Sequence, residues 1–206
     1  MIDTLIFDFG NVFIDLNHDR AYQKLNALGY QGFSEEMQLQ NLQFEKGLIS
    51  TSDFIEFYRP HFAGISEEEL IATWNAVIGD FPKHRLEFLQ KIADSKQYKL
   101  ILLSNTNALH IEHIAAKTSF YNDFIACFDR VYFSHEMNLR KPDPEIYRAV
   151  LEQENLNPES CFFIDDLSEN TKAAEQLGIK SWNLQPGKEE VVELFTLHQK
   201  LLKDFK

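Results

Sequence analysis

Short, nearly continuous apolar segments recur along the chain and predict buried β-strands. Strands that are covered on both faces, as in a parallel sheet, have apolar residues in a row rather than in alternation. The segments that match this pattern are residues 4–8, Lys99–Ser104, Arg130–Phe133, Cys161–Asp165 and Lys180–Asn183.

The stretches between the later segments have helical spacing. Apolar residues recur at i, i+3 and i+4 in residues 108–119, 145–155 and 170–177, and Gly178 follows the third stretch as a C-cap. Strands that alternate with helices are typical of an α/β fold with right-handed crossovers. We therefore expect a doubly wound, Rossmann-like parallel sheet, followed by an amphipathic surface helix at residues 189–206.

Residues 18–88 interrupt this alternation, because no convincing strand occurs there. Ser34, Ser50 and Ser66 are each followed by acidic residues, which is the pattern of a helix N-cap with a favourable first turn. We expect an α-helical cap at residues 18–88, inserted into an α/β core formed by residues 1–17 and 89–206. The alternative is one mixed α/β domain without a separate cap.

Composition narrows the choice of partners. The 206 residues contain 20 Lys+Arg and 32 Asp+Glu, which gives a net charge of −12. This charge argues against binding to nucleic acid or to anionic membranes, so we expect neither as a partner. An anionic substrate would need a local cation or metal. The N-terminus lacks the basic region of a secretory signal, and Cys127 and Cys161 match no metal-binding spacing, so we expect a cytoplasmic location with reduced thiols.

Polar residues that carry chemistry follow the predicted strands. In open α/β sheets, ligands bind beyond the carboxyl ends of the strands, so these residues should meet at one edge. They are Asp8 after the first strand, Ser104 and Asn105 at the end of the second, Lys141 in the loop before the fourth, and Asp165 and Asp166 at the end of the fourth.

This set of residues fits the handling of a phosphoryl group. Carboxylates that lie close together stay ionised only when a cation neutralises them. Ligands that offer oxygen alone, without His or Cys, favour a hard ion such as Mg²⁺. A metal, a lysine and a hydroxyl can then offset the phosphoryl charge while a carboxylate attacks phosphorus.

These motifs resemble the haloacid dehalogenase-like (HAD) hydrolases, which are mostly phosphatases, over nearly the whole chain. The inserted segment 18–88 is similar to the α-helical cap of that family. The segments FDFGNV, LLSNTNALH, RKP-x-x-x-IY and FFIDD resemble, more narrowly, its bacterial glucose-1-phosphate phosphatase branch.

The resemblance implies a role for each residue at the strand ends. Asp8 is the nucleophile, and Lys141 is a second catalytic residue that balances charge on the nucleophile and the phosphate. Ser104 and Asn105 bind phosphoryl oxygens. The implied ligands of Mg²⁺ are Asp8, the Gly10 carbonyl, Asp166 and, directly or through water, Asp165.

Gly10 departs from the common family pattern, D-x-D, in which the second aspartate transfers protons. General acid–base help of this kind is typically worth about 10²–10⁴-fold. The branch named above also carries glycine there, so inactivity does not follow. Asp15, Asp165 or a cap residue are the candidate substitutes.

In the cap, Lys46 is expected to reach the substrate. Arg20 at the cap entry is a weaker candidate for a substrate contact.

The favoured hypothesis is a Mg²⁺-dependent phosphatase that hydrolyses a small, soluble phosphomonoester through an aspartyl-phosphate intermediate. The expected substrate class is sugar phosphates. The protein's expected partner is this phosphorylated small molecule, and the chain itself is expected to be a monomer or weak homodimer. One alternative is a metal-independent 2-haloacid dehalogenase, since these enzymes also lack the second aspartate. The other is a catalytically silent protein that binds phosphate.

Overall fold

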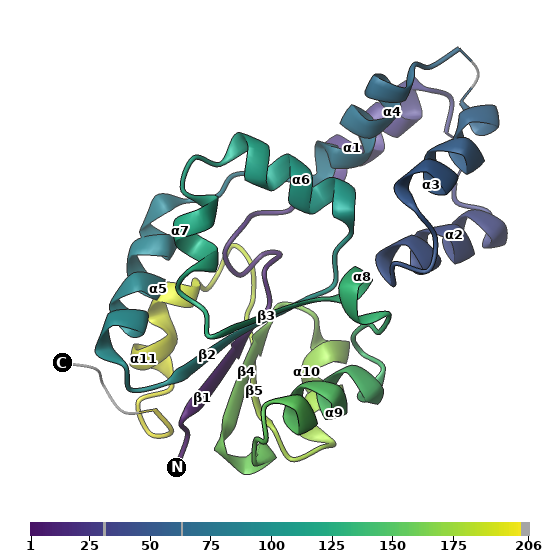
Figure 1. Cartoon of the computed structure of the whole chain (residues 1–206). Helices are drawn as coiled ribbons and strands as arrows, with labels where there is room; N and C mark the ends of the chain where they lie inside the picture. Colours follow the sequence, from purple (N-terminus) through teal and green to yellow (C-terminus); the bar gives the residue numbers. More distant parts are fainter. Residues whose placement is uncertain (31, 63, 203–206) are drawn as a thin grey trace.

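The computed structural model describes residues 1–30, 32–62 and 64–202 and contains a five-stranded parallel sheet (Figure 1). The strands follow the order β3-β2-β1-β4-β5. Their bounds agree with the apolar segments to within one residue, at β1 Thr4–Phe7, β2 Lys99–Ser104, β3 Arg130–Phe133, β4 Cys161–Asp165 and β5 Lys180–Asn183. The predicted doubly wound parallel fold is therefore confirmed.

Helices cover both faces of the sheet, which explains why the inner strands β1, β2 and β4 are buried along nearly their whole length, while the edge strands β3 and β5 are partly exposed. On one face, Leu5 and Phe7 belong to a cluster with the buried sides of α5 (Lys83–Ser95), α6 (Ala108–Lys117) and α7 (Tyr121–Ile125). On the other face, Ile6 packs with α9 (Pro144–Gln153) and α10 (Ser168–Glu175). The sheet is thus the middle layer of three, and its carboxyl edge remains available for a site.

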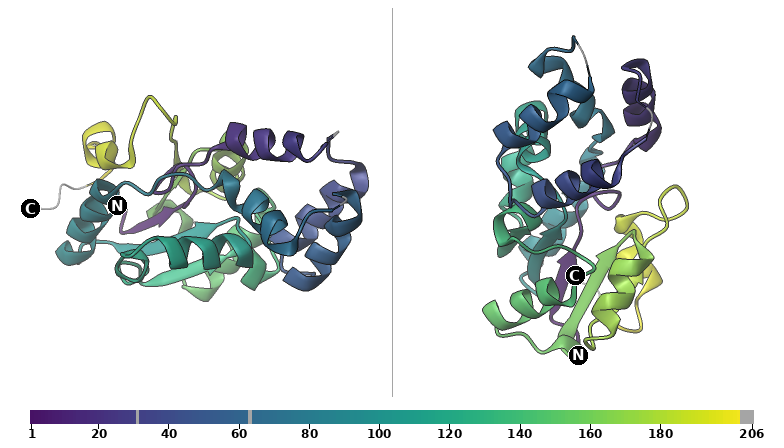
Figure 2. Two further views of the ribbon diagram at one scale, coloured as in Figure 1. Left: turned by 90° about the horizontal axis from the view of Figure 1, so that it is seen from above. Right: turned by 90° about the vertical axis from the view of Figure 1, so that its right-hand side faces the viewer.

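A group of helices lies beyond the carboxyl ends of the strands (Figures 1 and 2). These helices share a further hydrophobic cluster, which includes Phe54 and Tyr58 and which Leu109 of α6 also joins. The hydroxyls of Ser34, Ser50 and Ser66 accept hydrogen bonds from the backbone at Met37, Asp53 and Glu69, so all three predicted N-caps are present. The elements of this group are α1 His18–Ala27, α2 Glu35–Glu45, α3 Thr51–Tyr58, η1 Arg59–His61, α4 Glu67–Trp74 and η2 Asn75–Val77.

The C-terminal boundary expected for the cap, between residues 88 and 89, falls inside α5. That helix begins at Lys83, and its buried residues Leu86 and Phe88 pack with the sheet rather than with the cap helices. The chain crosses between the two parts where Leu16 bridges Ile78 in antiparallel fashion. The periodicity of apolar residues shows which face of a helix is buried. It does not show whether that face packs on the sheet or on the cap helices, so the sequence pattern could not place this boundary.

The remaining elements are short. They are α8 (Ser134–Met137), η3 (Pro158–Ser160), η4 (Val191–Glu193) and α11 (Leu194–Leu197). The helix expected at residues 189–206 is thus reduced to a few turns over its described part, and residues 203–206 lie outside the described residues. Over the described chain, none of the helices has both the length and the apolar character needed to cross a membrane.

Candidate active site

Lys141 is the centre of the polar group at the carboxyl edge of the sheet. Its Nζ donates hydrogen bonds to Asp8 Oδ1 at 2.7 Å, to Asp165 Oδ2 at 2.7 Å and to the carbonyl of Leu103 at 2.8 Å. The residue is only 1% exposed. A buried ammonium is stable only when it is paired and fully hydrogen-bonded, and these three acceptors meet that requirement.

Asn105 holds the loop that carries Lys141. Its side-chain nitrogen donates to the Lys141 carbonyl at 2.8 Å, and its side-chain oxygen accepts from the Lys141 backbone N–H at 2.9 Å. The side-chain amide of Asn105 is thus engaged on both atoms in this structure. Ser104 lies at the end of β2 and lines the neighbouring cavity, where its hydroxyl can meet a ligand.

Asp165 and Asp166 differ in the bonds that they make. Both oxygens of Asp165 accept hydrogen bonds inside the protein, from the Leu167 N–H, from Asn170 Nδ2 and from Lys141 Nζ. Its carboxylate is therefore saturated and fully buried. Asp166 is partly exposed and accepts one side-chain bond, at Oδ2 from Asn11 at 2.9 Å. Asp166 is the carboxylate with an oxygen left for a ligand.

Asn11 is a residue of this site that the sequence analysis did not single out. It has φ +53°, in the left-handed region that asparagine tolerates better than most residues. Its side-chain oxygen accepts from the Leu16 backbone N–H, which leaves Nδ2 directed at Asp166. An asparagine in the turn three residues after Asp8 was the available signal, but its partner is 155 residues away in sequence.

The charges of this site are not balanced by the protein alone. Asp8, Asp165 and Asp166 each place a carboxylate oxygen within 4.8 Å of the others. Lys141 supplies one positive charge, so the ionised group carries a net charge of −2. Burial raises the pKa of Asp8 to about 7, and Asp165 adds to this effect against the opposing influence of Lys141. Burial also raises the pKa of Asp166.

This donor set fits a hard divalent cation. The three side chains offer only oxygen, and a charge of +2 would balance the excess. Gly10 lies in the same loop, where an added Cβ would come within 2.9 Å of Leu16 Cδ1. A side chain at this position would require Leu16 to move, so the packing of this loop is matched to glycine.

A cavity of about 270 Å³ lies between the sheet edge and the cap helices, lined by Ser104 and Asn105 from the core. Its walls are mainly apolar, with contributions from Phe9, Leu16 and Trp74. Three polar side chains of the cap, His18, Asn41 and Glu45, also reach it. Among the described residues that line the cavity there is no lysine or arginine.

Lys46 does not line this cavity. Its Nζ forms an ion pair with Asp143 Oδ2 at 2.9 Å, while the adjacent Glu45 pairs with Arg140 at 3.1 Å. Both contacts join the end of α2 to the loop that carries Lys141. The expectation that Lys46 reaches the substrate is not supported by this arrangement.

The candidate substitutes for the acid missing at Gly10 are also placed by the structure. Asp15 binds Arg85 at 2.7 Å and lines a separate cavity with Asn11, and Asp165 is committed to Lys141.

The third candidate was a cap residue, and the titratable cap side chains that line the cavity beside Ser104 are His18 and Glu45. His110 of the core was not among the candidates, but it lines the same cavity. Burial lowers its pKa to about 4, so it is uncharged at neutral pH and is not an effective proton donor.

Known proteins of similar sequence and structure share this architecture. The family model of haloacid dehalogenase-like hydrolases matches residues 2–178. The chain is 25% identical over 199 residues to a D-ribitol-5-phosphate phosphatase of Bacteroides thetaiotaomicron, covering 91% of this chain and 94% of that one. It is 25% identical to a phosphorylated carbohydrates phosphatase of Thermotoga maritima, covering 87% and 83% of the two chains.

A solved structure agrees with the sequence relatives. It is that of a HAD family enzyme from Bacteroides thetaiotaomicron in complex with magnesium and inorganic phosphate. It superposes with a TM-score of 0.83 at 34% identity, over 92% of this chain and 97% of that chain. The match of the family model to most of the chain shows that this protein belongs to the haloacid dehalogenase-like hydrolase family.

Proposed function

We propose that this protein is a Mg²⁺-dependent phosphatase that hydrolyses a small phosphomonoester, with sugar phosphates as the substrate class. The observation that carries the proposal is the position of Lys141 Nζ, 2.7 Å from both Asp8 and Asp165, beside a third carboxylate that has an oxygen left for a ligand. The names of the phosphatase relatives and the magnesium and phosphate in the similar solved structure support it.

The metal would be held by Asp8, Asp166 and the Gly10 carbonyl. Asp165 would act on it indirectly, since its oxygens are already used by Lys141 and Asn170. When bound, Mg²⁺ neutralises the excess negative charge of the site and lets a phosphate dianion approach the carboxylates.

Asp8 would form a covalent intermediate. One carboxylate oxygen of Asp8 is bound by Lys141, and the other would attack phosphorus. The bond between phosphorus and the ester oxygen would break, and the ester oxygen would leave as an alkoxide that takes its proton from solvent water. Water then cleaves the aspartyl-phosphate, which releases inorganic phosphate and restores Asp8. Ser104 and Asn105 would bind the phosphoryl oxygens, Asn105 through its backbone because its side chain holds the Lys141 loop.

The leaving group is where this site differs from a D-x-D phosphatase. Gly10 has no side chain to protonate the departing oxygen, and Asp15 is bound to Arg85. Substrates whose leaving oxygen needs little protonation should therefore be favoured, as with a phosphate on the anomeric carbon of a sugar. The absence of lysine and arginine from the described cavity lining favours monophosphates over bisphosphates.

Release of inorganic phosphate from a panel of sugar monophosphates, with and without chelator, tests the proposal. The matched assay is halide release from 2-chloropropionate, which a metal-independent dehalogenase would give. A net charge of −2 at the site disfavours a haloacid anion in the absence of metal. Chelator-resistant halide release without phosphatase activity would overturn the proposal, and no turnover in either assay would indicate a silent binding protein.

A further inference from the structure

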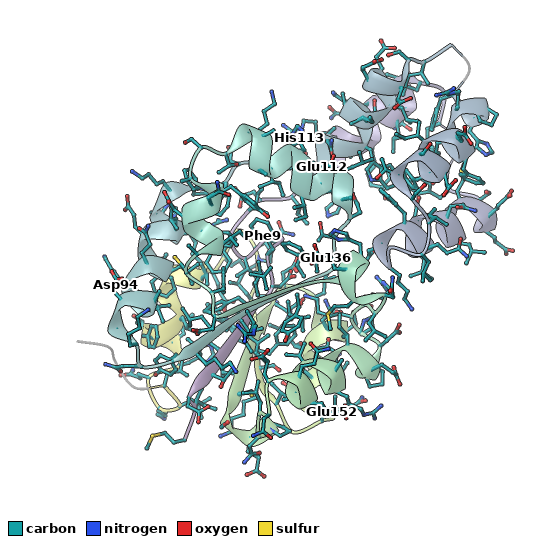
Figure 3. All side chains as sticks on the ribbon, viewed as in Figure 1. Phe9, Asp94, Glu112, His113, Glu136 and Glu152 are labelled. Atoms are coloured by element: carbon teal, nitrogen blue, oxygen red, sulfur yellow. The ribbon has the colours of Figure 1, made fainter. Side chains whose placement is uncertain are left out.

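A group of basic side chains lies away from the carboxylates, on the outer side of the junction between cap and core. Arg20 and Lys24 come from α1, and His113 and Lys117 come from α6. All four line an open cavity of about 600 Å³ together with residues of α4 and η2. Figure 3 shows His113 on α6, the core helix that lies beside the base of the cap. The group is therefore formed by residues of both the cap and the core.

Among the described residues, none of these cations has a carboxylate partner. The ion pairs formed by the described residues use other lysines and arginines. Arg20 donates instead to the backbone carbonyls of Ala76 and Ile78, which fixes its guanidinium in place. Among the residues that line the cavity, three permanent cations face one carboxylate, that of Glu68. A local excess of +2 is notable in a chain with a net charge of −12.

The titration of His113 reflects the same concentration of charge. Its pKa is lowered by burial, and further by the nearby charges of Lys117 and Arg20. Like charges brought together in this way are unfavourable unless something offsets them.

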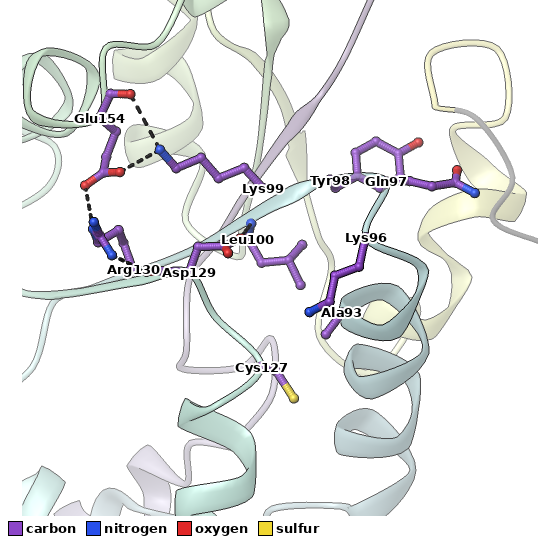
Figure 4. Close-up of a pocket in the computed structure, with 10 residues that line it drawn as sticks. All are labelled: Ala93, Lys96, Gln97, Tyr98, Lys99, Leu100, Cys127, Asp129, Arg130 and Glu154. Atoms are coloured by element: carbon purple, nitrogen blue, oxygen red, sulfur yellow. Dashed lines mark hydrogen bonds and ion pairs between the residues drawn. The ribbon is translucent and has the colours of Figure 1, made fainter.

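The largest contrast is with a cavity of about 440 Å³ at the opposite edge of the sheet (Figure 4). That cavity also contains basic residues, but Lys99 and Arg130 both bind the carboxylate of Glu154, at 2.6 and 3.0 Å. Those cations have a structural partner. Lys96 of that cavity forms no ion pair with a described residue, but the lining there carries three permanent cations and two carboxylates, an excess of +1. The cavity at the cap junction has the larger excess, +2, and none of its cations has a carboxylate partner among the described residues.

Asn75 is one of the residues that line the same cavity, and it carries a buried polar atom with no partner. Asn75 is 5% exposed, and its side-chain oxygen accepts no hydrogen bond. A buried acceptor without a donor is unfavourable, because it has lost its hydrogen bonds to water and gained none in the protein. A hydroxyl on a bound molecule would satisfy it, whereas a bare anion would not.

We propose that Arg20, Lys24, His113 and Lys117 form a second, non-catalytic binding site for a small phosphorylated molecule that carries hydroxyl groups. The lysines and the arginine bind the phosphate, and Asn75 accepts from a hydroxyl. Because the site is composed of α1 from the cap and α6 from the core, its ligand links the two parts across their junction. The site contains none of the residues assigned to phosphate hydrolysis, so it goes beyond the proposed function and does not depend on it.

Isothermal titration calorimetry with inorganic phosphate tests the site, on the Mg²⁺-loaded protein and again in chelator. The informative variant is the pair Lys24→Gln and Lys117→Gln, because neither side chain forms an ion pair with a described residue and folding should be unaffected. The control is the pair Lys91→Gln and Lys180→Gln, two exposed lysines elsewhere that change the net charge equally. We expect the first pair to weaken phosphate binding at least about tenfold in chelator, since charge-assisted bonds are lost, and the control pair to leave it unchanged.

The choice of ligand distinguishes a free phosphate from a phosphorylated metabolite. In chelator, glycerol 1-phosphate should bind more tightly than inorganic phosphate, and glycerol should not bind. Equal affinity for the two phosphates would overturn the assignment of a hydroxyl to Asn75. No binding by the wild-type protein, or equal binding by both lysine pairs, would overturn the site itself. Loss of phosphatase activity alone would not affect these outcomes, because no turnover is measured.

Discussion

Lys141 and Asp165 form an ion pair of 2.7 Å in which the two side chains are 1% and 0% exposed. The pair is built from a loop and a strand end, and Asn170 together with the Leu167 N–H fixes the carboxylate from the other side. Asp165 therefore positions the lysine, whereas the adjacent Asp166 faces outward with an oxygen left for a ligand. Two acidic residues that are adjacent in sequence thus make different contacts in the folded protein.

This division predicts different effects for two conservative substitutions. Asp166→Asn should weaken Mg²⁺ binding at least about tenfold, because a charged ligand is lost. Asp165→Asn should instead lower kcat and leave the Mg²⁺ affinity less affected, because Lys141 loses its anchor. Calorimetric Mg²⁺ titration beside the Mg²⁺ dependence of phosphate release measures both. If the two variants lose the same Mg²⁺ affinity, Asp165 is a metal ligand as well.

The nucleophile is tested by Asp8→Asn. This change keeps the shape of the side chain but removes its charge and most of its nucleophilicity, so kcat should fall by several orders of magnitude. Circular dichroism and thermal melting should show a folded protein, since Lys141 retains Asp165 as its partner. A variant that kept more than about a tenth of kcat, a loss below about 1.4 kcal/mol in barrier, would exclude Asp8 as the attacking group.

Removal of the buried cation should affect stability as well as activity. Lys141→Met leaves two buried carboxylates without their partner, and breaking such a pair typically costs about 3–5 kcal/mol. The free energy of unfolding, measured by denaturant titration in chelator at pH 8, should fall by a comparable amount. Lys172→Met, at an exposed position of α10, is the control. A loss of less than about 1 kcal/mol would mean that the pair contributes little to folding.

The raised pKa of Asp8 predicts a pH dependence of metal binding. In the metal-free protein its pKa is about 7, above the ordinary value of 3.8, because burial disfavours the carboxylate. Below pH 7 the carboxyl is protonated and must lose its proton to bind Mg²⁺. The Mg²⁺ affinity should therefore rise with pH up to about 7 and then level off, with proton release at pH 6 but not at pH 8.5.

Calorimetry at pH 6 in two buffers of different ionisation enthalpy measures the released proton, and Asp8→Asn should abolish the difference. The same shift has a consequence for folding. A carboxyl whose pKa is raised on folding contributes stability that is complete below pH 3.8 and is lost as the pH rises through 7. In chelator, this group should thus make the wild-type protein less stable at pH 8 than at pH 5, relative to Asp8→Asn.

The contact between cap and core can be tested at Gly47. This residue has φ +65°, and an added Cβ would lie 1.9 Å from the His135 carbonyl oxygen. Gly47→Ala must push the end of α2 away from the core and disturb the nearby Lys46–Asp143 ion pair. Gly29→Ala is a matched control, since Gly29 has φ +80° but nothing within 4 Å of the added atom. Both variants bear the backbone strain of about 1 kcal/mol.

We expect Gly47→Ala to raise KM for sugar phosphates severalfold more than for a small aryl phosphate, and Gly29→Ala to leave both unchanged. The reason is that Glu45, two residues before Gly47, lines the cavity beside the phosphate site. Equal changes for all substrates would show that this contact serves folding or general chemistry rather than substrate selection.

Local chemistry was enough to place most of the secondary structure. The five predicted segments became the five strands, and the reason is clearest for β1, β2 and β4, because a strand that is buried on both faces is mainly apolar. Ser34, Ser50 and Ser66 begin helices because a hydroxyl can cap the backbone N–H groups of the first turn. The sequence did not predict that α5 begins at Lys83 and packs on the sheet. Helical periodicity identifies the buried face of a helix but not the surface on which that face packs.

The site, too, was predicted from the sequence only in part. That Asp8, Lys141, Asp165 and Asp166 gather at one edge followed from the sequence, since the carboxyl ends of parallel strands meet there. Which acid holds the lysine, which one is free for a ligand, and that Lys46 turns to Asp143 were decided by the tertiary structure alone. These relationships depend on distances of a few ångströms between side chains far apart along the chain, and such distances exist only once the chain has packed.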